Sequence, residues 1–156
     1  GGKIMQENNS IGYHIFNTEK LIGRYILSKF DKQARHRISP MQVMIMKYLL
    51  KNQNKKIFQQ DICDTFNLRR STVSGILTTM EKNAIIIRKV AREDPRKNEI
   101  KLTKMFVNNT KEVSAELMNL ESILEQDFTL EEKAELIRLL KKLEGNLIEE
   151  ERKKDV

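Results

Sequence analysis

The sequence predicts a mainly α-helical chain with one small antiparallel sheet of two strands near its middle. Apolar residues recur at helical spacing over most of the 156 residues, and only two Pro and six Gly are available to interrupt helices. One β-branched run, Ile85–Ile86–Ile87, departs from that spacing. Charged residues make up 33% and hydrophobic residues 39% of the chain, which is typical of a globular protein rather than a disordered one.

Two helices are expected in the N-terminal third of the chain. The first spans Ile11 to about Phe30, where apolar residues recur every three or four positions. The second begins at Ser39 and Pro40, which suit an N-cap and a first helical turn. Its apolar stripe is expected to contain Met44, Ile45, Tyr48 and Leu49.

A very short strand at Ile57–Phe58 and two short helices are expected next. These helices cover Gln60 to Phe66 and Ser71 to about Asn83, and their tight connection indicates a helix-turn-helix. The second helix of such a pair can enter the major groove of DNA. Its N-terminal and outward side chains are therefore candidate DNA contacts: Arg69, Arg70, Ser71, Thr72, Ser74, Gly75 and Thr78. The alternative is an ordinary surface helix with a polar face.

A β-hairpin with a cationic tip is expected after the helix pair. Its strands cover Ile85 to Ala91 and Glu99 to Thr103, and Asp94–Pro95–Arg96–Lys97 has the chemistry of a type I turn. Such a tip can reach a narrow minor groove, with Asp94 holding the Arg96 guanidinium by a charge-assisted hydrogen bond. The candidate DNA contacts here are Arg88, Arg92, Asp94, Arg96 and Lys97. The alternative is a solvated turn in which Asp94 only shapes the backbone.

The order of the predicted elements divides the chain into three parts. Residues 38–104 have the order of a winged helix-turn-helix, with long helical segments at 1–37 and 105–156 on either side. The net charge is +7, and residues 38–104 alone carry a surplus of eight positive charges, whereas residues 105–156 have a surplus of five negative charges. This distribution favours a polyanionic partner, such as double-stranded DNA, for the middle part.

These motifs resemble those of the MarR family of bacterial transcriptional regulators. The hairpin sequence Asp94–Pro95–Arg96 through Ile100 to Leu102–Thr103 is similar to the family's wing. The segments Ser71–Lys82 and Thr129–Leu147, the latter opening with a capping box, resemble its recognition helix and last helix. Two positions depart from the family's pattern: Ala84 replaces the usual Gly, so Asn83 is expected to supply the left-handed cap, and Arg69 replaces a capping Ser.

The resemblance implies a homodimer in which the first helix and the last two helices are dimerisation helices. It also implies a regulator, expected to be a repressor, that binds a pseudo-palindromic operator with Arg96 in the minor groove. Many members of the family release DNA when small aromatic or phenolic effectors bind between the DNA-binding and dimerisation parts. Candidate ligand-binding residues, for which core packing is the alternative role, are Ile15, Tyr25, Met44, Tyr48 and Phe106.

Several other functions are not supported by the sequence. His14, His36 and the single Cys63 do not form a metal-binding pattern, and no nucleophile–base pair or phosphate-binding Gly loop is present. We therefore expect no enzyme activity, metal or cofactor. No segment is apolar enough to cross a membrane and no secretion signal is recognisable, so a cytoplasmic protein is expected. Two alternatives stay open: a protein-interaction module without DNA binding, and an oxidant-responsive regulator acting through Cys63.

Overall fold

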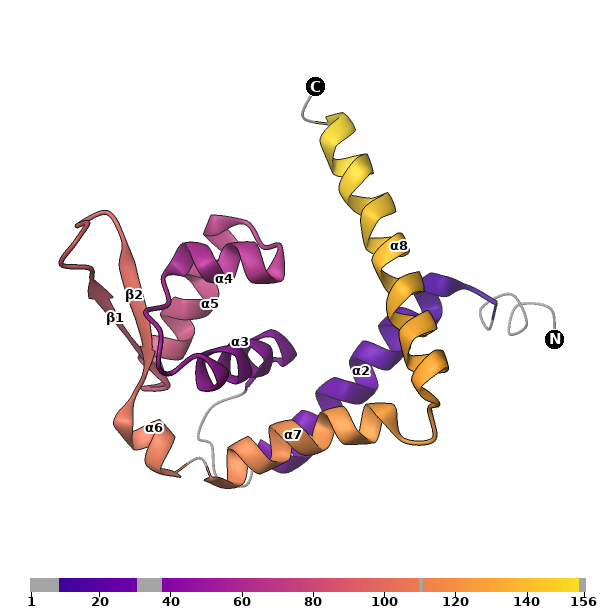
Figure 1. Cartoon of the computed structure of the whole chain (residues 1–156), viewed down its shortest axis with the longest axis horizontal. Helices are drawn as coiled ribbons and strands as arrows, with labels where there is room; N and C mark the ends of the chain where they lie inside the picture. The colour runs from indigo at the N-terminus through magenta and orange to yellow at the C-terminus, as the bar shows by residue number, and fades with distance from the viewer. Residues whose placement is uncertain (1–8, 31–37, 110, 155–156) are drawn as a thin grey trace. The chain divides into compact units, whose positions relative to one another are not determined.

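The computed structural model describes residues 9–30, 38–109 and 111–154 (Figure 1). The chain divides into two compact units, residues 1–117 and 118–156. Every helix among the described residues is too short or too polar to span a membrane. His36 and the predicted domain boundary after residue 37 lie outside the described residues.

The first unit contains helices and one hairpin in the order that the sequence predicts. Its elements are α2 (Ile11–Phe30), α3 (Pro40–Lys51), α4 (Gln59–Phe66), α5 (Arg70–Lys82), β1 (Ile86–Val90), β2 (Asn98–Leu102) and α6 (Lys104–Asn109). The mainly α-helical fold with a small β wing is thereby confirmed. In Figure 1 the hairpin lies beside α5, and the turn between its strands is directed away from α6.

Helix α3 begins as predicted but buries a different face. Ser39 caps it reciprocally: the Gln42 amide donates to Ser39 Oγ at 3.2 Å, and the Ser39 amide donates to Gln42 Oε1 at 3.1 Å. The prediction for Met44 was wrong, because its side chain is 43% exposed while Met46 is fully buried. The segment Val43–Leu50 is apolar at almost every position, so its sequence does not indicate which face turns inward.

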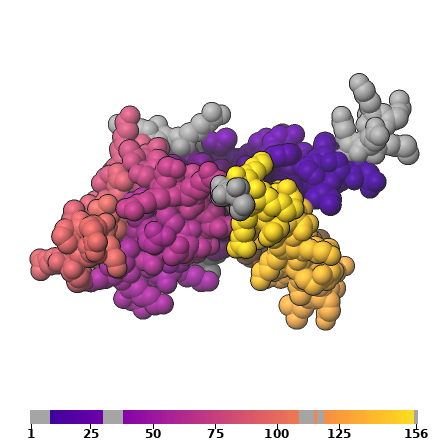
Figure 2. Space-filling model, turned by 90° about the horizontal axis from the view of Figure 1, so that it is seen from above, coloured from indigo at the N-terminus to yellow at the C-terminus, as the bar shows by residue number. Residues whose placement is uncertain are grey.

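The core of the first unit lies between the helix-turn-helix and the hairpin. Its completely buried side chains come from α3, α4, α5, β1 and β2 and include Ile45, Ile62, Val73, Leu77, Met80, Ile86 and Ile100. The hairpin pairs Ile86 with Leu102 and Arg88 with Ile100, and the predicted short strand adds an isolated bridge between Phe58 and Glu99. In Figure 2 the magenta side chains of this part form one continuous packed body, from which the salmon hairpin projects.

Helix α5 is followed by a left-handed residue at position 84, a conformation that glycine adopts more easily than alanine. Ala84 adopts the left-handed conformation with φ 56°, whereas Asn83 has φ −86°, so the expected left-handed cap at Asn83 was wrong. The Ile85 amide donates to the Met80 carbonyl at 2.9 Å, and the Ala84 amide donates to the Glu81 carbonyl at 3.0 Å. These two bonds define a Schellman motif, and its geometry places the left-handed residue at position 84.

The helices at the C-terminal end are α7 (Lys111–Glu125), which crosses the boundary between the units, and α8 (Leu130–Lys154). The predicted capping box at Thr129 is confirmed, because the Glu132 amide donates to Thr129 Oγ1 at 3.1 Å and the Thr129 amide donates to Glu132 Oε2 at 2.9 Å. No residue of α8 is buried. Its half-exposed or exposed apolar side chains include Leu136, Ile137, Leu139, Leu140 and Leu147.

Candidate nucleic-acid interface

The start of α5 presents two exposed arginines, Arg69 and Arg70. Asn67 ends α4 in the left-handed conformation with φ 49°, and the Leu68 amide donates to the Cys63 carbonyl at 3.0 Å. Arg69 then occupies the N-cap of α5 without a side-chain capping bond, since a guanidinium has no acceptor. Both Arg69 and Arg70 are exposed, and neither forms an ion pair within the part of the chain that the structure describes.

The outward face of α5 is small and polar, as the sequence predicts. Ser71, Thr72, Gly75 and Thr78 are exposed, while Ser74 is half-buried. A Cβ added at Gly75 would meet open space, so packing within the chain does not require a glycine there. This face permits close approach of another molecule to the helix backbone. The roles of these residues as DNA contacts stay predictions.

The turn of the wing is organised by Asp94. The Lys97 amide donates to the Asp94 carbonyl at 3.0 Å, which closes the predicted turn. The Arg96 amide and Nε donate to Asp94 Oδ1 at 3.0 and 3.1 Å, and Nη2 donates to Oδ2 at 3.4 Å. The Arg96 side chain is nevertheless 90% exposed. The expected hydrogen bond between Asp94 and the guanidinium is therefore confirmed, and it fixes the direction of an exposed cation.

These bonds also affect the ionisation of Asp94. The guanidinium and then the backbone amide of Arg96 donate to its carboxylate and lower the pKa of Asp94, and the positive charge of Lys97 lowers it further. Desolvation acts in the opposite direction but is outweighed. Asp94 is therefore held in the charged form that the turn requires at neutral pH.

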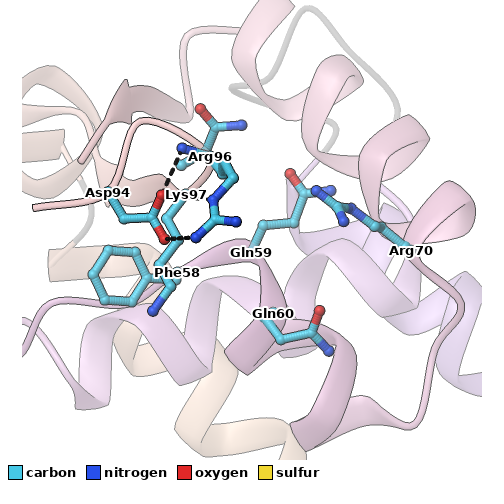
Figure 3. A pocket seen from close by; sticks show the side chains of 8 residues that line it. Phe58, Gln59, Gln60, Arg70, Asp94, Arg96 and Lys97 are labelled. Atoms are coloured by element: carbon cyan, nitrogen blue, oxygen red, sulfur yellow. Dashed lines mark hydrogen bonds and ion pairs between the residues drawn. The ribbon is translucent and has the colours of Figure 1, made fainter.

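A small open pocket joins the wing turn to the starts of α4 and α5 (Figure 3). Its volume is about 220 Å³, and it is lined by Phe58, Gln59, Gln60, Arg70, Asp94, Arg96, Lys97 and Asn98. The Lys97 ammonium lies 5.4 Å from the centre of the Phe58 ring, a cation–π contact that orients it. Three cations and one carboxylate line this pocket, so its net positive charge favours an anion.

The pocket includes residues that the sequence analysis missed. Phe58 was placed in a short strand and Gln60 at a helix start, both without a functional role, and Gln59 was assigned to neither element. The structure brings them to Arg70 and the wing turn, which are distant in sequence. The available signal was the position of Gln59 and Gln60 at the beginning of the first helix of a helix-turn-helix, because this helix crosses the DNA backbone in such motifs.

The two remaining predicted DNA contacts, Arg88 and Arg92, have different surroundings. Arg92 is exposed and forms no ion pair within the described residues. Arg88 is directed to α5 instead, where its Nε and Nη2 donate to Glu81 Oε2 at 3.0 and 2.8 Å. Its Nη2 also donates to Thr78 Oγ1 at 3.1 Å. Arg88 therefore connects the hairpin to α5.

The five candidate ligand-binding residues do not line the pocket at the wing turn, and they do not line a second pocket beside α3 and β2. Ile15 and Met44 are exposed, whereas Tyr25, Tyr48 and Phe106 are half-buried. Tyr48 contacts Phe66 edge-on, with the ring centres 5.8 Å apart. The second pocket, of about 190 Å³, is lined by Leu49, Asn52, Gln53, Lys55, Ile57, Ile100, Lys101, Leu102 and Val107. The ligand site stays a prediction.

Cys63 and the possible metal ligands add no second site to the described residues. Cys63 is buried with 6% exposure, as expected of a packing residue. No group of three or more His, Cys, Asp or Glu side chains among residues 9–30, 38–109 and 111–154 is arranged to hold a metal ion. The candidate site of the first unit is therefore the surface formed by α5, the wing turn and the pocket between them.

Comparison with known proteins identifies the fold. No protein-family model and no curated protein sequence match the chain. Solved structures do match: MarR from Oenococcus oeni PSU-1 superposes with a TM-score of 0.69 and 24% identity over 86% of this chain and 98% of the other. The chain has the MarR-type winged-helix fold.

Two structures of S. aureus MepR support the same fold. MepR in a DNA-binding conformation matches with a TM-score of 0.72 and 22% identity, over 88% of this chain and 98% of MepR. A MepR–DNA complex matches with a TM-score of 0.68 and 23% identity, over 85% of this chain and 91% of MepR. The MarR-type fold thus accounts for most of this chain and nearly all of these neighbours, including the helices on either side of the winged helix.

Proposed function

We propose that the protein is a sequence-specific DNA-binding transcriptional regulator that acts as a homodimer, with repression the expected outcome. The observation that carries this proposal is the convergence of cationic side chains from the start of α5 and the wing turn around one open pocket. The fold is shared with S. aureus MepR, which has been crystallised with DNA. We expect the same class of partner here because Arg69 and Arg70 are exposed without an ion pair among the described residues, and the Arg96 side chain stays 90% exposed although Asp94 orients it.

Each part of this surface would contact a different feature of the duplex. Helix α5 would enter the major groove with Arg69 and Arg70 at its leading end, where a guanidinium can bond two acceptors of guanine or a phosphate. The wing would place Arg96 in the adjacent minor groove, since narrow A·T-rich grooves attract arginine. A backbone phosphate would then lie over the pocket between them, near Lys97 and Arg70.

Dimerisation is proposed from the exposed apolar side chains of the helices outside the winged helix. Leu136, Leu139 and Leu140 are all at least 40% exposed on α8, and Phe16 of α2 is 71% exposed. Burying one such side chain contributes about 1.5–3 kcal/mol, so a second copy that covers these faces would gain substantial free energy. Two copies would present two recognition helices about 34 Å apart, which requires a pseudo-palindromic DNA site.

Selection of bound fragments from a random DNA pool at ~150 mM salt tests this proposal, because weak non-specific attraction is suppressed there. We expect recovery of an A·T-rich pseudo-palindrome by the wild type and its loss with Arg96→Ala. Arg138→Ala is the matched control, since Arg138 is an exposed arginine on α8 that pairs with Glu135. Recovery of unrelated fragments, with no salt-dependent retention of DNA, would instead favour a protein-interaction module.

A further inference from the structure

A two-donor ion pair joins the recognition helix to the wing. Arg88 lies in the middle of β1, opposite Ile100, and both Nε and Nη2 donate to one oxygen of Glu81. The Arg88 side chain is only 21% exposed and the Glu81 side chain 40% exposed. A partly shielded pair with two charge-assisted bonds is stronger than an ordinary surface ion pair.

The negative charge of Glu81 has two electrostatic costs: it destabilises the end of α5, and it repels DNA. Glu81 lies in the last turn of α5, where the negative end of the helix dipole repels a carboxylate. A negative charge on a helix proposed to lie against phosphates also weakens association by simple electrostatics. The bond to Arg88 offers a reason for a carboxylate at this position.

The pair also acts on the outward face of α5. Thr78 accepts a hydrogen bond from Arg88 Nη2 at 3.1 Å and donates its own to the Ser74 carbonyl at 2.8 Å. Arg88 therefore holds two residues of α5, Thr78 and Glu81, which are one helical turn apart. Two anchor points on one face restrain the rotation of a helix about its axis relative to the strand.

We propose that the Glu81–Arg88 pair is a positioning bridge for DNA binding, which rests on the proposed function. It holds α5 at the rotation at which the recognition helix and the wing turn contact the duplex together. Arg88 then supports DNA affinity without touching DNA, and Glu81 supports it although its charge repels DNA. Both are positioning residues: Arg88 acts on α5 through its bonds to Glu81.

The test uses the sign of the effect of Glu81→Ala on affinity for the selected operator. Electrostatics alone predicts tighter binding when the negative charge is removed, whereas the bridge predicts weaker binding by about tenfold. Alanine is a better helix former than glutamate, so local destabilisation of α5 is not expected. Glu93→Ala is the matched control: it removes a carboxylate that pairs with Lys56 and should leave binding unchanged or stronger.

Two further variants separate a bridge from a direct contact. Arg88→Ala should weaken binding as much as Glu81→Ala, the double variant should lose no more, and the slope of log affinity against log salt should not change. A direct phosphate contact by Arg88 would instead reduce that slope by about 0.9. Exchanging the charges, with Glu81→Arg and Arg88→Glu together, should restore most of the affinity at an unchanged thermal midpoint.

The outcomes for the bridge and for the proposed function are distinguishable. Specific binding by the wild type together with equal or tighter binding by Glu81→Ala overturns the bridge and leaves the regulator proposal intact. Failure of the wild type to bind any selected DNA overturns both. Weaker binding by both single variants, with rescue by the charge exchange, supports the bridge.

Discussion

The two compact units differ in how completely one chain buries their apolar side chains. In the first unit Val73, Leu77 and Met80 of α5 are fully buried against neighbouring elements. In the second unit α8 has no buried residue, and Leu147 is 62% exposed. The winged helix therefore has its core within one chain, whereas the leucine stripe of α8 is an exposed apolar surface, as the proposed dimer interface requires.

The N-terminal and C-terminal parts of the chain also differ in the sign of their net charge. Residues 1–104 have a surplus of twelve positive charges, and residues 105–156 have a surplus of five negative charges. The exposed cations of the first unit would be covered by a polyanion, while the exposed leucines of the second would be covered by other apolar side chains. DNA binding and self-association should therefore be separable by substitution.

The largest expected effect is on self-association. Leu140→Asp places a carboxylate in the apolar stripe of α8 and should weaken the dimer at least about a hundredfold, because an unpaired charge cannot be buried cheaply. Sedimentation over a range of protein concentrations measures this change. Lys142→Asp is the control, since residue 142 lies on the opposite face of the helix. A dimer that survives Leu140→Asp would contradict the proposed role of α8.

The next largest effect is on DNA affinity alone. Arg96→Ala removes the exposed cation that Asp94 orients and should weaken operator binding by about ten- to a hundredfold. The sedimentation behaviour and thermal midpoint should stay those of the wild type, because the Arg96 side chain is 90% exposed. Fluorescence anisotropy with a labelled operator gives the affinity. Unchanged affinity would contradict the wing assignment, and a lost dimer would contradict the separation of the two units.

Local signals in the sequence were sufficient for much of the fold. The N-cap at Ser39, the capping box at Thr129 and the turn at Asp94 depend on partners two or three residues away, and all three formed as predicted. The rotation of α3 was not predictable in this way, since Met44 and Met46 are chemically equal and only the rest of the core determines which is buried.

The candidate site was predictable only in part, for a related reason. The polar face of α5 and the exposed cations of the wing follow from helical periodicity and turn chemistry. The pairing of Arg88 with Glu81, and the approach of Phe58 and Gln59 to Arg70, depend on how α4, α5 and β1 pack. Nothing local in the sequence indicated that Arg88 would pair with Glu81.

A smaller effect, confined to stability, is expected at the end of α5. A non-glycine residue in the left-handed conformation costs about 1–2 kcal/mol, and glycine loses part of this gain through its greater freedom when unfolded. Ala84→Gly should therefore stabilise the protein by about 0.5–1 kcal/mol and raise the thermal midpoint by about 1–4 °C. Calorimetry at fixed protein concentration measures this. Ala91→Gly, in a position without positive φ, is the control and should lower the midpoint.

The smallest effect expected is a pH dependence at Asp94 that lies outside the neutral range. Arg96 lowers the pKa of Asp94, so the contribution of the charged carboxylate to the turn is complete above the ordinary pKa and is lost only as pH falls through the lowered one, below about 4. The ratio of operator affinities of the wild type and Asp94→Asn should therefore be constant from about pH 5 to pH 8. A ratio that falls toward one between pH 7 and pH 5 would mean that Asp94 titrates in that range, and that the guanidinium does not hold the carboxylate charged. A constant ratio above one would show that the ordered turn, and not only the presence of Arg96, contributes to the affinity of the first unit for DNA.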